Sequence, residues 1–301
     1  MSTSRGGGGY RGPVDVAVDA PLQRVIDYYE VAGPDYEAWS PEFNMHFGYY
    51  RWGMNPWRLA PMLEQMNAEV LARLGLPDGP VRVLDMGCGL GEAARYVARR
   101  RADAEVTALT IAPSQAQRGN RMTASAGLTR RVQIFHADYT RAPVASGSQD
   151  GAYAIESFCH ARGPGRAACV RELRRVLRAG GRFVVADGFM KHGGRLPRWL
   201  NHVRRKVCEG WAIEAFAELP AFVATLHEHG FADITVEEVF WPLAPSAAHV
   251  PATAARFLLR ERRRGPLDAL RLGNALAPVY GLALGLARRH FAYHLVSGRA
   301  T

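Results

Sequence analysis

Residues 81–91 combine an apolar run with three closely spaced glycines. The run 81–84 has the apolar and β-branched character of a buried strand. Gly87, Gly89 and Gly91 follow it. Because glycine lacks a Cβ, a turn built from these residues can take positive φ angles and let a ligand touch the backbone. A strand, such a turn and a following helix N-terminus together predict a nucleotide-like binding site.

The spacing of the glycines indicates which ligand to expect. A dinucleotide-binding turn reads G-x-G-x-x-G, but the residue five places after Gly87 is Glu92. An acid, Asp85, stands two residues before the first glycine, where a carboxylate would repel a pyrophosphate and attract an ammonium group. The pattern D-x-G-x-G-x-G resembles the first motif of class I S-adenosylmethionine (SAM)-dependent methyltransferases. The resemblance implies that Asp85 and the three glycines bind SAM, which leaves as S-adenosylhomocysteine; the alternative is an incidental glycine turn in another α/β protein.

A second group of residues precedes the glycine turn and is rich in aromatic side chains. The run His46-Phe47-Gly48-Tyr49, with Tyr29 upstream, resembles the N-terminal segment of the sterol, tocopherol and geranyl-diphosphate C-methyltransferases. The resemblance implies that Tyr29, His46 and Gly48 close over the methionine end of SAM. Aromatic faces attract cations and would suit a sulfonium. The same aromatics could instead form the core of a helical cap, and both interpretations stay open.

The next two predicted strands each end in candidate cofactor ligands. The strand expected over 105–109 ends at Thr110, where many methyltransferases carry an acid for the ribose. The run from Thr110 through Ile111 to Gln115 resembles the form of the C-methyltransferase subgroup, which implies uncharged hydrogen bonds to the ribose. After a strand over 132–136, the resemblance implies that Asp138 accepts a hydrogen bond from the adenine amino group. The backbone N–H of Tyr139 would face the ring.

The fourth predicted strand, 150–155, opens onto Glu156 and His160. Ligands of open parallel sheets bind beyond the carboxyl ends of the strands, so this segment should face the transferred methyl. Glu156 matches an acid of the sterol and geranyl-diphosphate enzymes, and His160 matches a histidine of several relatives. We expect Glu156 to stabilise a carbocation and His160 to help or to act as the base. The alternative is a Glu–His pair that only holds the loop in shape.

The alternation of apolar segments predicts an α/β fold, a Rossmann-like seven-stranded methyltransferase sheet with its last strand antiparallel. A helix over 165–178 is expected to end in a glycine C-cap at 179–181, and the basic, glycine-rich stretch 188–211 is expected to be a substrate loop. The expected organisation is a flexible tail (1–20), an N-terminal helical and aromatic lid (21–80), a SAM-binding core (81–240), a helical cap between the last two strands (241–289) and a final edge strand (290–301). The apolar part of the cap could instead lie on a membrane surface or join two subunits.

Composition sets limits on location and partners. The formal charge of +10 comes almost wholly from arginine, since only Lys191 and Lys206 are lysines. It indicates either a solvated surface or attraction of an anionic substrate such as a diphosphate, or of an acidic lipid surface. Four cysteines without C-x-x-C spacing and the lack of an evident signal peptide predict a cytoplasmic protein with no metal site. We expect no membrane span, since no stretch of 18 apolar residues appears, although peripheral contact stays open.

Together these patterns predict a SAM-dependent methyltransferase that acts on a small hydrophobic molecule. One form of this hypothesis gives the molecule a negative charge or a diphosphate group. The leading hypothesis is methylation of a carbon in an isoprenoid or lipid-like olefin of specialised metabolism. O- or N-methylation of a natural product is the alternative, and a non-catalytic SAM-binding or membrane-associated protein is a third. The segment after the fourth strand lacks the Asn/Asp-Pro-Pro-aromatic pattern of DNA amino-methyltransferases, so no nucleic-acid partner is expected. A homo-oligomer formed through the cap or the N-terminal segment is expected. The arginines that could bind a diphosphate are Arg162, Arg166, Arg204, Arg205 and residues 262–264.

Overall fold

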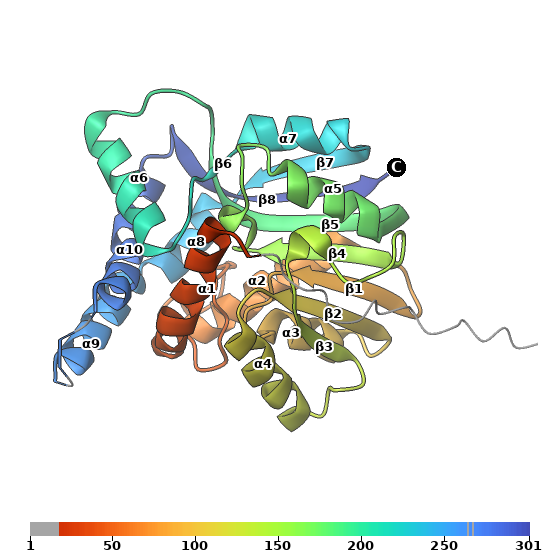
Figure 1. Cartoon of the computed structure of the whole chain (residues 1–301), viewed down its shortest axis with the longest axis horizontal. Coiled ribbons are helices and arrows are strands. Elements are labelled where there is room, and N and C mark those ends of the chain that lie inside the picture. Colours follow the sequence, from red (N-terminus) through yellow and green to blue (C-terminus); the bar gives the residue numbers. More distant parts are fainter. Residues whose placement is uncertain (1–17, 264, 267) are drawn as a thin grey trace, which may run out of the picture.

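The computed structural model describes residues 18–263, 265–266 and 268–301, so most of the predicted tail lies outside the described residues. One twisted sheet runs through the middle of the molecule, with helices on both faces (Figure 1). Its strands lie in the order β3 (Val132–His136), β2 (Ala104–Thr110), β1 (Val81–Met86), β4 (Gln149–Ile155), β5 (Leu177–Met190), β8 (Phe291–Ala300) and β7 (Phe231–Glu238).

The pairing directions confirm the predicted fold class. The first five strands of that order are parallel, whereas β8 is antiparallel to both β5 and β7. The predicted edge position of the final strand (290–301) is wrong, because β8 pairs on both sides and β7 takes the edge. The described sheet has eight strands rather than seven, because the two-residue β6 (Ala217–Glu218) pairs with the end of β5. A strand this short alters only the edge of the sheet, and the carboxyl ends of β1 to β5 still point the same way.

Helices cover each face of the sheet and bury a separate apolar core. One core lies under α5 (Ala167–Val176) and α7 (Leu219–Glu228). The other lies under α2 (Leu59–Leu74), α3 (Glu92–Arg100) and α4 (Pro113–Ser125). Burial of large apolar side chains on both faces fixes the strands, and with them the residues at the strand ends.

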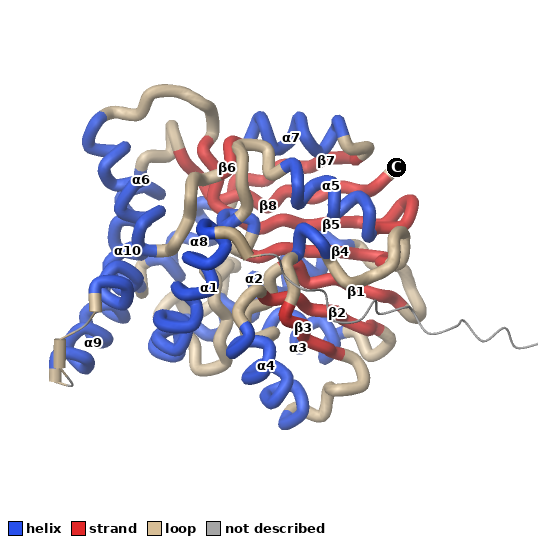
Figure 2. The backbone as a smooth tube through the Cα atoms, viewed as in Figure 1, coloured by secondary structure: helices blue, strands red, loops and turns tan. Residues whose placement is uncertain are grey.

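The remaining helices gather at one side of the sheet (Figure 2). They are α1 (Ala20–Ala32) with the 3₁₀-helix η1 (Gly33–Ala38), α6 (Arg198–Gly210), α8 (Phe240–Ala247), α9 (Val250–Arg262) and α10 (Ala269–Leu286). The last three form the predicted cap between β7 and β8. α10 packs closely on α6, since a Cβ added at Gly210 would lie 2.6 Å from the carbonyl oxygen of Gly273.

Two predictions about local structure are wrong. The stretch 188–211 is not one loop, because β5 continues to Met190 and α6 begins at Arg198. The glycine C-cap at 179–181 is also wrong: α5 ends at Val176, and its C-cap residue, Leu177, has extended dihedral angles and pairs with Gln149. In both places sheet pairing or helix packing, which local composition does not report, sets the conformation.

α10 also qualifies the expectation that no segment is apolar enough to span a membrane. It is the one helix among the described residues whose length and composition meet that criterion. It packs against α6, α9 and α1 and lines an internal cavity, so it has a place in the cap of the folded chain.

Candidate active site

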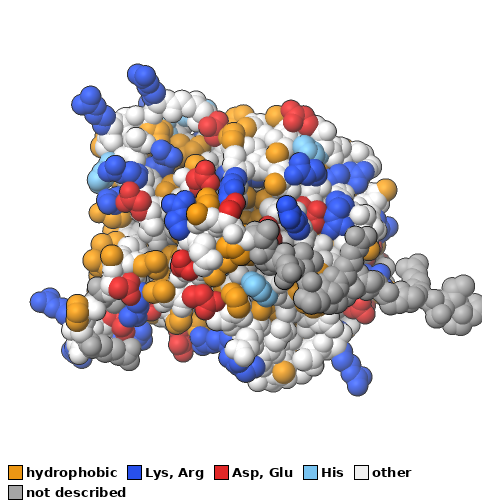
Figure 3. Space-filling view, viewed as in Figure 1, with side chains coloured by type: hydrophobic (Ala, Val, Ile, Leu, Met, Phe, Trp, Pro, Cys, Tyr) orange, Lys and Arg blue, Asp and Glu red, His pale blue; other side chains and the backbone are white. Residues whose placement is uncertain are grey.

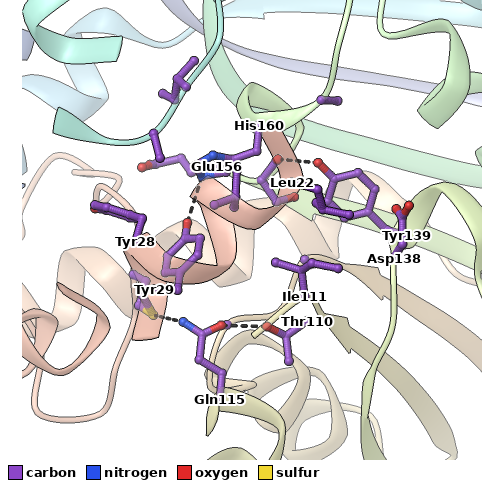
Figure 4. A pocket seen from close by; sticks show the side chains of 18 of the residues that line it. Leu22, Tyr28, Tyr29, Thr110, Ile111, Gln115, Asp138, Tyr139, Glu156 and His160 are labelled. Carbon is purple, nitrogen blue, oxygen red and sulfur yellow. Dashed lines mark hydrogen bonds between the residues drawn. The ribbon is translucent and has the colours of Figure 1, made fainter. Parts of the chain in front are cut away.

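A cavity of about 830 Å³ lies at the carboxyl ends of the parallel strands. Twelve of the fourteen predicted site residues line it, and several are labelled in Figure 4. These twelve are Tyr29, His46, Asp85, Gly87, Gly89, Thr110, Ile111, Gln115, Asp138, Tyr139, Glu156 and His160. Residues spread over 130 positions of sequence thus meet at one edge of the sheet, as the rule for open parallel sheets predicts.

The glycine turn after β1 has the backbone conformation that only glycine adopts without strain. Gly87, Gly89 and Gly91 have φ angles of +115°, +52° and +80°. A Cβ at Gly87 would lie 2.3 Å from the Cβ of Ser157, so this residue could not carry a side chain without a local shift. The N–H of Cys88 donates to the carbonyl of Leu109 (2.7 Å), which ties the turn to β2. Here the turn presents its backbone to the cavity.

Asp85 lies buried at the end of β1, beneath the glycine turn. It accepts a hydrogen bond from the Tyr153 hydroxyl (2.9 Å). Burial raises the pKa of its carboxyl to about 7, and the Tyr153 hydrogen bond opposes that rise. No cationic side chain bonds it among the residues that the structure describes. A cavity-lining acid with this need for a positive partner fits the ammonium group of SAM.

The predicted ribose and adenine ligands lie on the cavity wall, partly engaged with one another. The Thr110 hydroxyl donates to Gln115 Oε1 (2.7 Å), so it orients the Gln115 amide (Figure 4). Asp138 accepts bonds from the N–H and the hydroxyl of Thr140 (2.7 Å each), which fixes its carboxylate. The Tyr139 hydroxyl donates to the carbonyl of Ser157 (3.0 Å). All four residues line the cavity. Their contacts with SAM remain predictions.

Gly48 and Gly91 do not line the cavity. Gly48 packs against α2, where an added Cβ would lie 2.7 Å from Met62, and its N–H donates to the Ser246 hydroxyl (2.9 Å). Gly91 is the N-cap of α3, and an added Cβ would lie 2.4 Å from the Cδ1 of Ile134. Close packing therefore explains both glycines without a direct contact to the cofactor.

A second cavity, of about 430 Å³, lies under the cap and is lined mostly by apolar side chains. It shares a wall with the first cavity. Seven residues belong to both linings: Tyr28, Tyr29, Met45, His46, Glu156, His160 and Ile213. A ligand in the first cavity and an apolar molecule in the second would therefore meet at Glu156 and His160.

Glu156 is held in place by groups from distant elements. Its Oε1 accepts hydrogen bonds from the N–H of Phe47 (2.7 Å) and from the Tyr293 hydroxyl (3.0 Å). Its φ of +48° is unusual for a residue with a side chain and turns it away from the direction of β4. Burial raises the pKa of Glu156, the hydrogen bonds from Phe47 and Tyr293 lower it and the nearby Asp187 raises it, and the net pKa is about 8. A carboxyl group with this pKa is largely protonated near pH 7. A positive charge placed beside it would lower its pKa and favour the carboxylate.

His160 pairs with Tyr29 rather than with Glu156. The Tyr29 hydroxyl lies 2.9 Å from Nε2 of His160 (Figure 4). Burial lowers the pKa of His160 to about 4, so the ring is neutral at pH 7, and the tautomer of the ring decides which of the two groups donates. Because no hydrogen bond joins Glu156 to His160, a Glu–His pair that only holds the loop is not the arrangement found.

The buried acids predict a stability that falls with pH near neutrality. Glu156 and Asp85 have pKa values of about 8 and about 7, well above the ordinary 4.5 and 3.8. Between about pH 6.5 and 8 the folded chain therefore holds protons that the unfolded chain has released. The free energy of unfolding should fall by up to about 1.4 kcal/mol per pH unit per group. The lowered pKa of His160 makes the free energy of unfolding rise with pH, but only between about pH 4 and 6.5.

Urea denaturation at several pH values measures this slope. The cofactor-free wild type should lose stability between about pH 6.5 and 8, and Glu156→Gln should lose less, because one titrating carboxyl is gone. A wild-type stability that stays level or rises across that window would contradict a buried, neutral Glu156.

The structure adds site residues that the sequence did not reveal. Tyr293 on β8 and Asp187 on β5 line the apolar cavity, as do Tyr36 and Asn274. Asp187 could have been found, since it lies on the strand next to β4 at the same sheet edge. No such signal marked Tyr36, Asn274 or Tyr293. These residues lie in the lid, in the cap and on an antiparallel strand, respectively.

None of the described arginines proposed for a diphosphate lines the apolar cavity, and Arg264, which was also proposed, lies outside the described residues. Arg162 pairs with Asp19 and Glu214, and Arg166 is buried and bonds backbone carbonyls, among them that of Gly163. Arg204 and Arg205 lie on α6, and of these only Arg205 lines the larger cavity. Basic side chains are spread over the face seen in Figure 3 rather than gathered in one patch. Most of the excess charge on this face is therefore solvated.

Comparisons with known proteins agree with this geometry. Residues 83–181 match the family model described as a methyltransferase domain. Among curated proteins, a methyltransferase, GfsG, of Streptomyces halstedii is 36% identical over 169 residues, which are 56% of this chain and 59% of that protein. A chloroplastic tocopherol O-methyltransferase of Arabidopsis thaliana is 27% identical over 261 residues, 77% of this chain and 72% of that protein. The chain thus spans about three fifths of the first of these relatives.

Solved structures share the fold over nearly the whole chain. A geranyl diphosphate C-methyltransferase from Streptomyces coelicolor A3(2), bound to Mg²⁺, geranyl-S-thiolodiphosphate and S-adenosylhomocysteine, has a TM-score of 0.73 at 15% identity, covering 96% of this chain and all of that one. The [4+2]-cyclase SpnF has a TM-score of 0.71 at 22% identity, covering 95% and 99%. The matched model, the glycine turn and this fold together identify residues 83–181 as a methyltransferase domain within a class I S-adenosylmethionine-dependent methyltransferase fold, and SAM is the cofactor that the larger cavity fits.

Proposed function

We propose that the chain transfers a methyl group from SAM to a carbon of a small hydrophobic olefin, of isoprenoid or lipid-like character, held in the apolar cavity. The observation that carries this proposal is the shared wall of the two cavities. Glu156 stands in that wall with one carboxylate oxygen fixed by Phe47 and Tyr293. A carboxyl group between a cationic cofactor and an apolar acceptor is placed to meet positive charge on either side.

SAM, when bound, supplies an electrophilic methyl group. The chain's own residues bring the acceptor close and exclude water, which is most of what an in-line displacement needs. Attack by the π-electrons of an alkene on this methyl would form a carbon–carbon bond and break the sulfur–methyl bond, whose electron pair leaves with S-adenosylhomocysteine. The neighbouring alkene carbon would then carry the positive charge. Glu156 as carboxylate stabilises that charge and then accepts the proton whose loss restores the double bond. The nearby positive charge lowers the pKa of Glu156 and so favours the required ionised form.

Similar proteins support this choice of chemistry without fixing the acceptor. Their names include a geranyl diphosphate C-methyltransferase and a cycloartenol-C-24-methyltransferase, and both describe methylation at the carbon of a terpenoid molecule. The subgroup resemblance rests on His46-Phe47-Gly48-Tyr49, on Thr110 to Gln115 and on Glu156. Of these residues, His46, Thr110, Ile111, Gln115 and Glu156 line the larger cavity.

A second candidate is methylation of a hydroxyl oxygen. The Tyr29–His160 pair favours it, because a neutral imidazole in the shared wall could accept a proton from an acceptor hydroxyl. The name of the Arabidopsis relative describes such a reaction. The two candidates assign the essential proton to different residues, so variants separate them.

Methyl-labelled SAM tests the two candidates directly. The chain would be incubated with prenyl diphosphates, with sterol-like olefins, and with phenolic or amine natural products, and NMR would locate the label. Label on carbon, lost in Glu156→Gln and retained at about a tenth of the rate or more in His160→Gln, supports the proposal. Label only on oxygen or nitrogen, with the opposite sensitivity, would replace it with the second candidate.

A further inference from the structure

The apolar cavity contains one buried polar group of unusual make-up. The Tyr28 hydroxyl donates to Oδ1 of Asn274 (2.6 Å) and lies 2.7 Å from the Tyr36 hydroxyl. All three residues line the cavity, and they come from α1, η1 and α10. Tyr28 and Asn274 are buried, and burial raises the pKa of both tyrosines, so their hydroxyls keep their protons. We call these residues the tyrosine–asparagine cluster.

Counting protons shows which hydrogen bonds the cluster can still make. Tyr28 has one proton and gives it to Asn274, so Tyr36 must be the donor to Tyr28. The oxygen of Tyr36 then keeps its lone pairs, and the amide nitrogen of Asn274 makes no hydrogen bond within the described part of the chain. The cluster therefore offers donors from Asn274 and an acceptor on Tyr36. A hydroxyl can use both, and a carbonyl can use the donors.

The charges around the cavity limit the acceptor further. Three acids line it, Asp35, Glu156 and Asp187, and no lysine or arginine does so among residues 18–263, 265–266 and 268–301. Asp35 is bound by both arms of the Arg271 guanidinium (2.7 and 3.0 Å). Asp187 accepts the N–H groups of Cys159 and Gly188 (2.8 Å each). An anion would thus meet carboxyl groups and no cation.

A divalent cation would not change this result. The described residues contain no group of three or more His, Cys, Asp or Glu side chains placed to hold a metal ion. Each of the three acids is already engaged by N–H or O–H donors. A diphosphate would have to bring its own metal into an apolar site whose acids already accept hydrogen bonds from the protein, and desolvation opposes that.

We propose that the apolar cavity binds an uncharged acceptor that carries a hydroxyl or carbonyl group, and that the tyrosine–asparagine cluster holds this group. The inference rests on the proposed function, since it names the acceptor class of that site. It separates this chain from the geranyl diphosphate enzyme, which is described in complex with a thiolodiphosphate ligand and Mg²⁺.

Equilibrium binding tests the inference without requiring turnover. The protein, saturated with S-adenosylhomocysteine, would be titrated with farnesol, with farnesyl diphosphate plus Mg²⁺, and with farnesene, which has the chain but no oxygen. Farnesol should bind about tenfold more tightly than either of the others. Equal or tighter binding of the diphosphate would overturn the charge argument, and equal binding of farnesene would overturn the role of the cluster.

A pair of variants tests the cluster itself. Asn274→Leu keeps the side-chain size but removes the amide, so it should weaken farnesol binding about tenfold and leave farnesene binding within about twofold. Asn201→Leu, on the exposed side of α6, is the matched control and should change neither. If Asn274→Leu does not fold, Tyr36→Phe removes the acceptor oxygen and should show the same selective loss. A loss for both ligands, or for neither, would contradict the inference.

Methyl transfer is a separate readout. Tight farnesol binding without methyl transfer to any acceptor would refute the proposed function and leave this inference standing.

Discussion

Replacing Glu156 by glutamine should lower kcat for a carbon acceptor by about 10²–10⁴-fold. The reason is chemical rather than structural. Glutamine keeps an oxygen that can accept the Phe47 N–H and the Tyr293 hydroxyl, so the loop should hold its shape. It cannot carry the negative charge that stabilises a carbocation or take up the proton afterwards. The dissociation constant for SAM should stay within about threefold of the wild-type value, as calorimetry can measure.

The control for this substitution is Glu64→Gln. Glu64 is more than half exposed and pairs with Arg100, so the change removes an acid from the surface only. Its kcat and its stability should match those of the wild type within error. If Glu156→Gln turned over a carbon acceptor as fast as this control does, the carbocation role of Glu156 would be wrong.

Replacing Gly87 by alanine should have the largest effect on the fold of the cofactor site. The φ of +115° is costly for any residue with a Cβ, and the added atom would lie 2.3 Å from the Cβ of Ser157. Strain and overpacking together should lower the free energy of unfolding by about 2–5 kcal/mol. SAM affinity should fall at least about tenfold, because the turn that presents its backbone to the cavity must shift.

Gly79→Ala is the matched control for the conformational cost of a Cβ at a positive φ angle. Gly79 also has a positive φ, +85°, but an added Cβ there would meet no atom within 4 Å. It should show only the conformational cost of about 1–2 kcal/mol and normal SAM binding. A second change, Ser157→Gly, should recover part of the loss in Gly87→Ala. Equal stability of the two single variants would show that the contact with Ser157 is unimportant.

The cofactor side of the site could be predicted from the sequence because it is local. Each candidate ligand lies at the end of a strand or within a few residues of it, as Asp85 lies near the end of β1 and Thr110 ends β2. The parallel sheet then brings these strand ends together at one edge. Local patterns therefore identified both the residues and their meeting point.

The acceptor side could not be predicted in the same way, because its contacts join distant segments. Tyr28 meets Asn274 across 246 residues, and Glu156 meets Tyr293 across 137. No periodicity reports such a pairing. The composition of 188–211 was also misleading, since an arginine-rich stretch forms the helix α6 once its apolar face packs on α10.

Two named relatives show why the fold alone leaves the reaction open. SpnF, with a TM-score of 0.71, is described as a [4+2]-cyclase, whereas the Streptomyces coelicolor protein is described as a C-methyltransferase. The difference must therefore lie in the site. In this chain Glu156 lines both cavities, and we propose that it favours methyl transfer.

The most direct measurement follows the fate of the labelled methyl group of SAM and of the acceptor in the same reaction. An uncharged olefin that carries a hydroxyl group would be supplied, and S-adenosylhomocysteine and product would be quantified over time. We predict one S-adenosylhomocysteine per methylated product, with the label on carbon and with no product from Glu156→Gln. Conversion of the acceptor to a rearranged or cyclised product without S-adenosylhomocysteine formation would contradict the proposed methyl transfer.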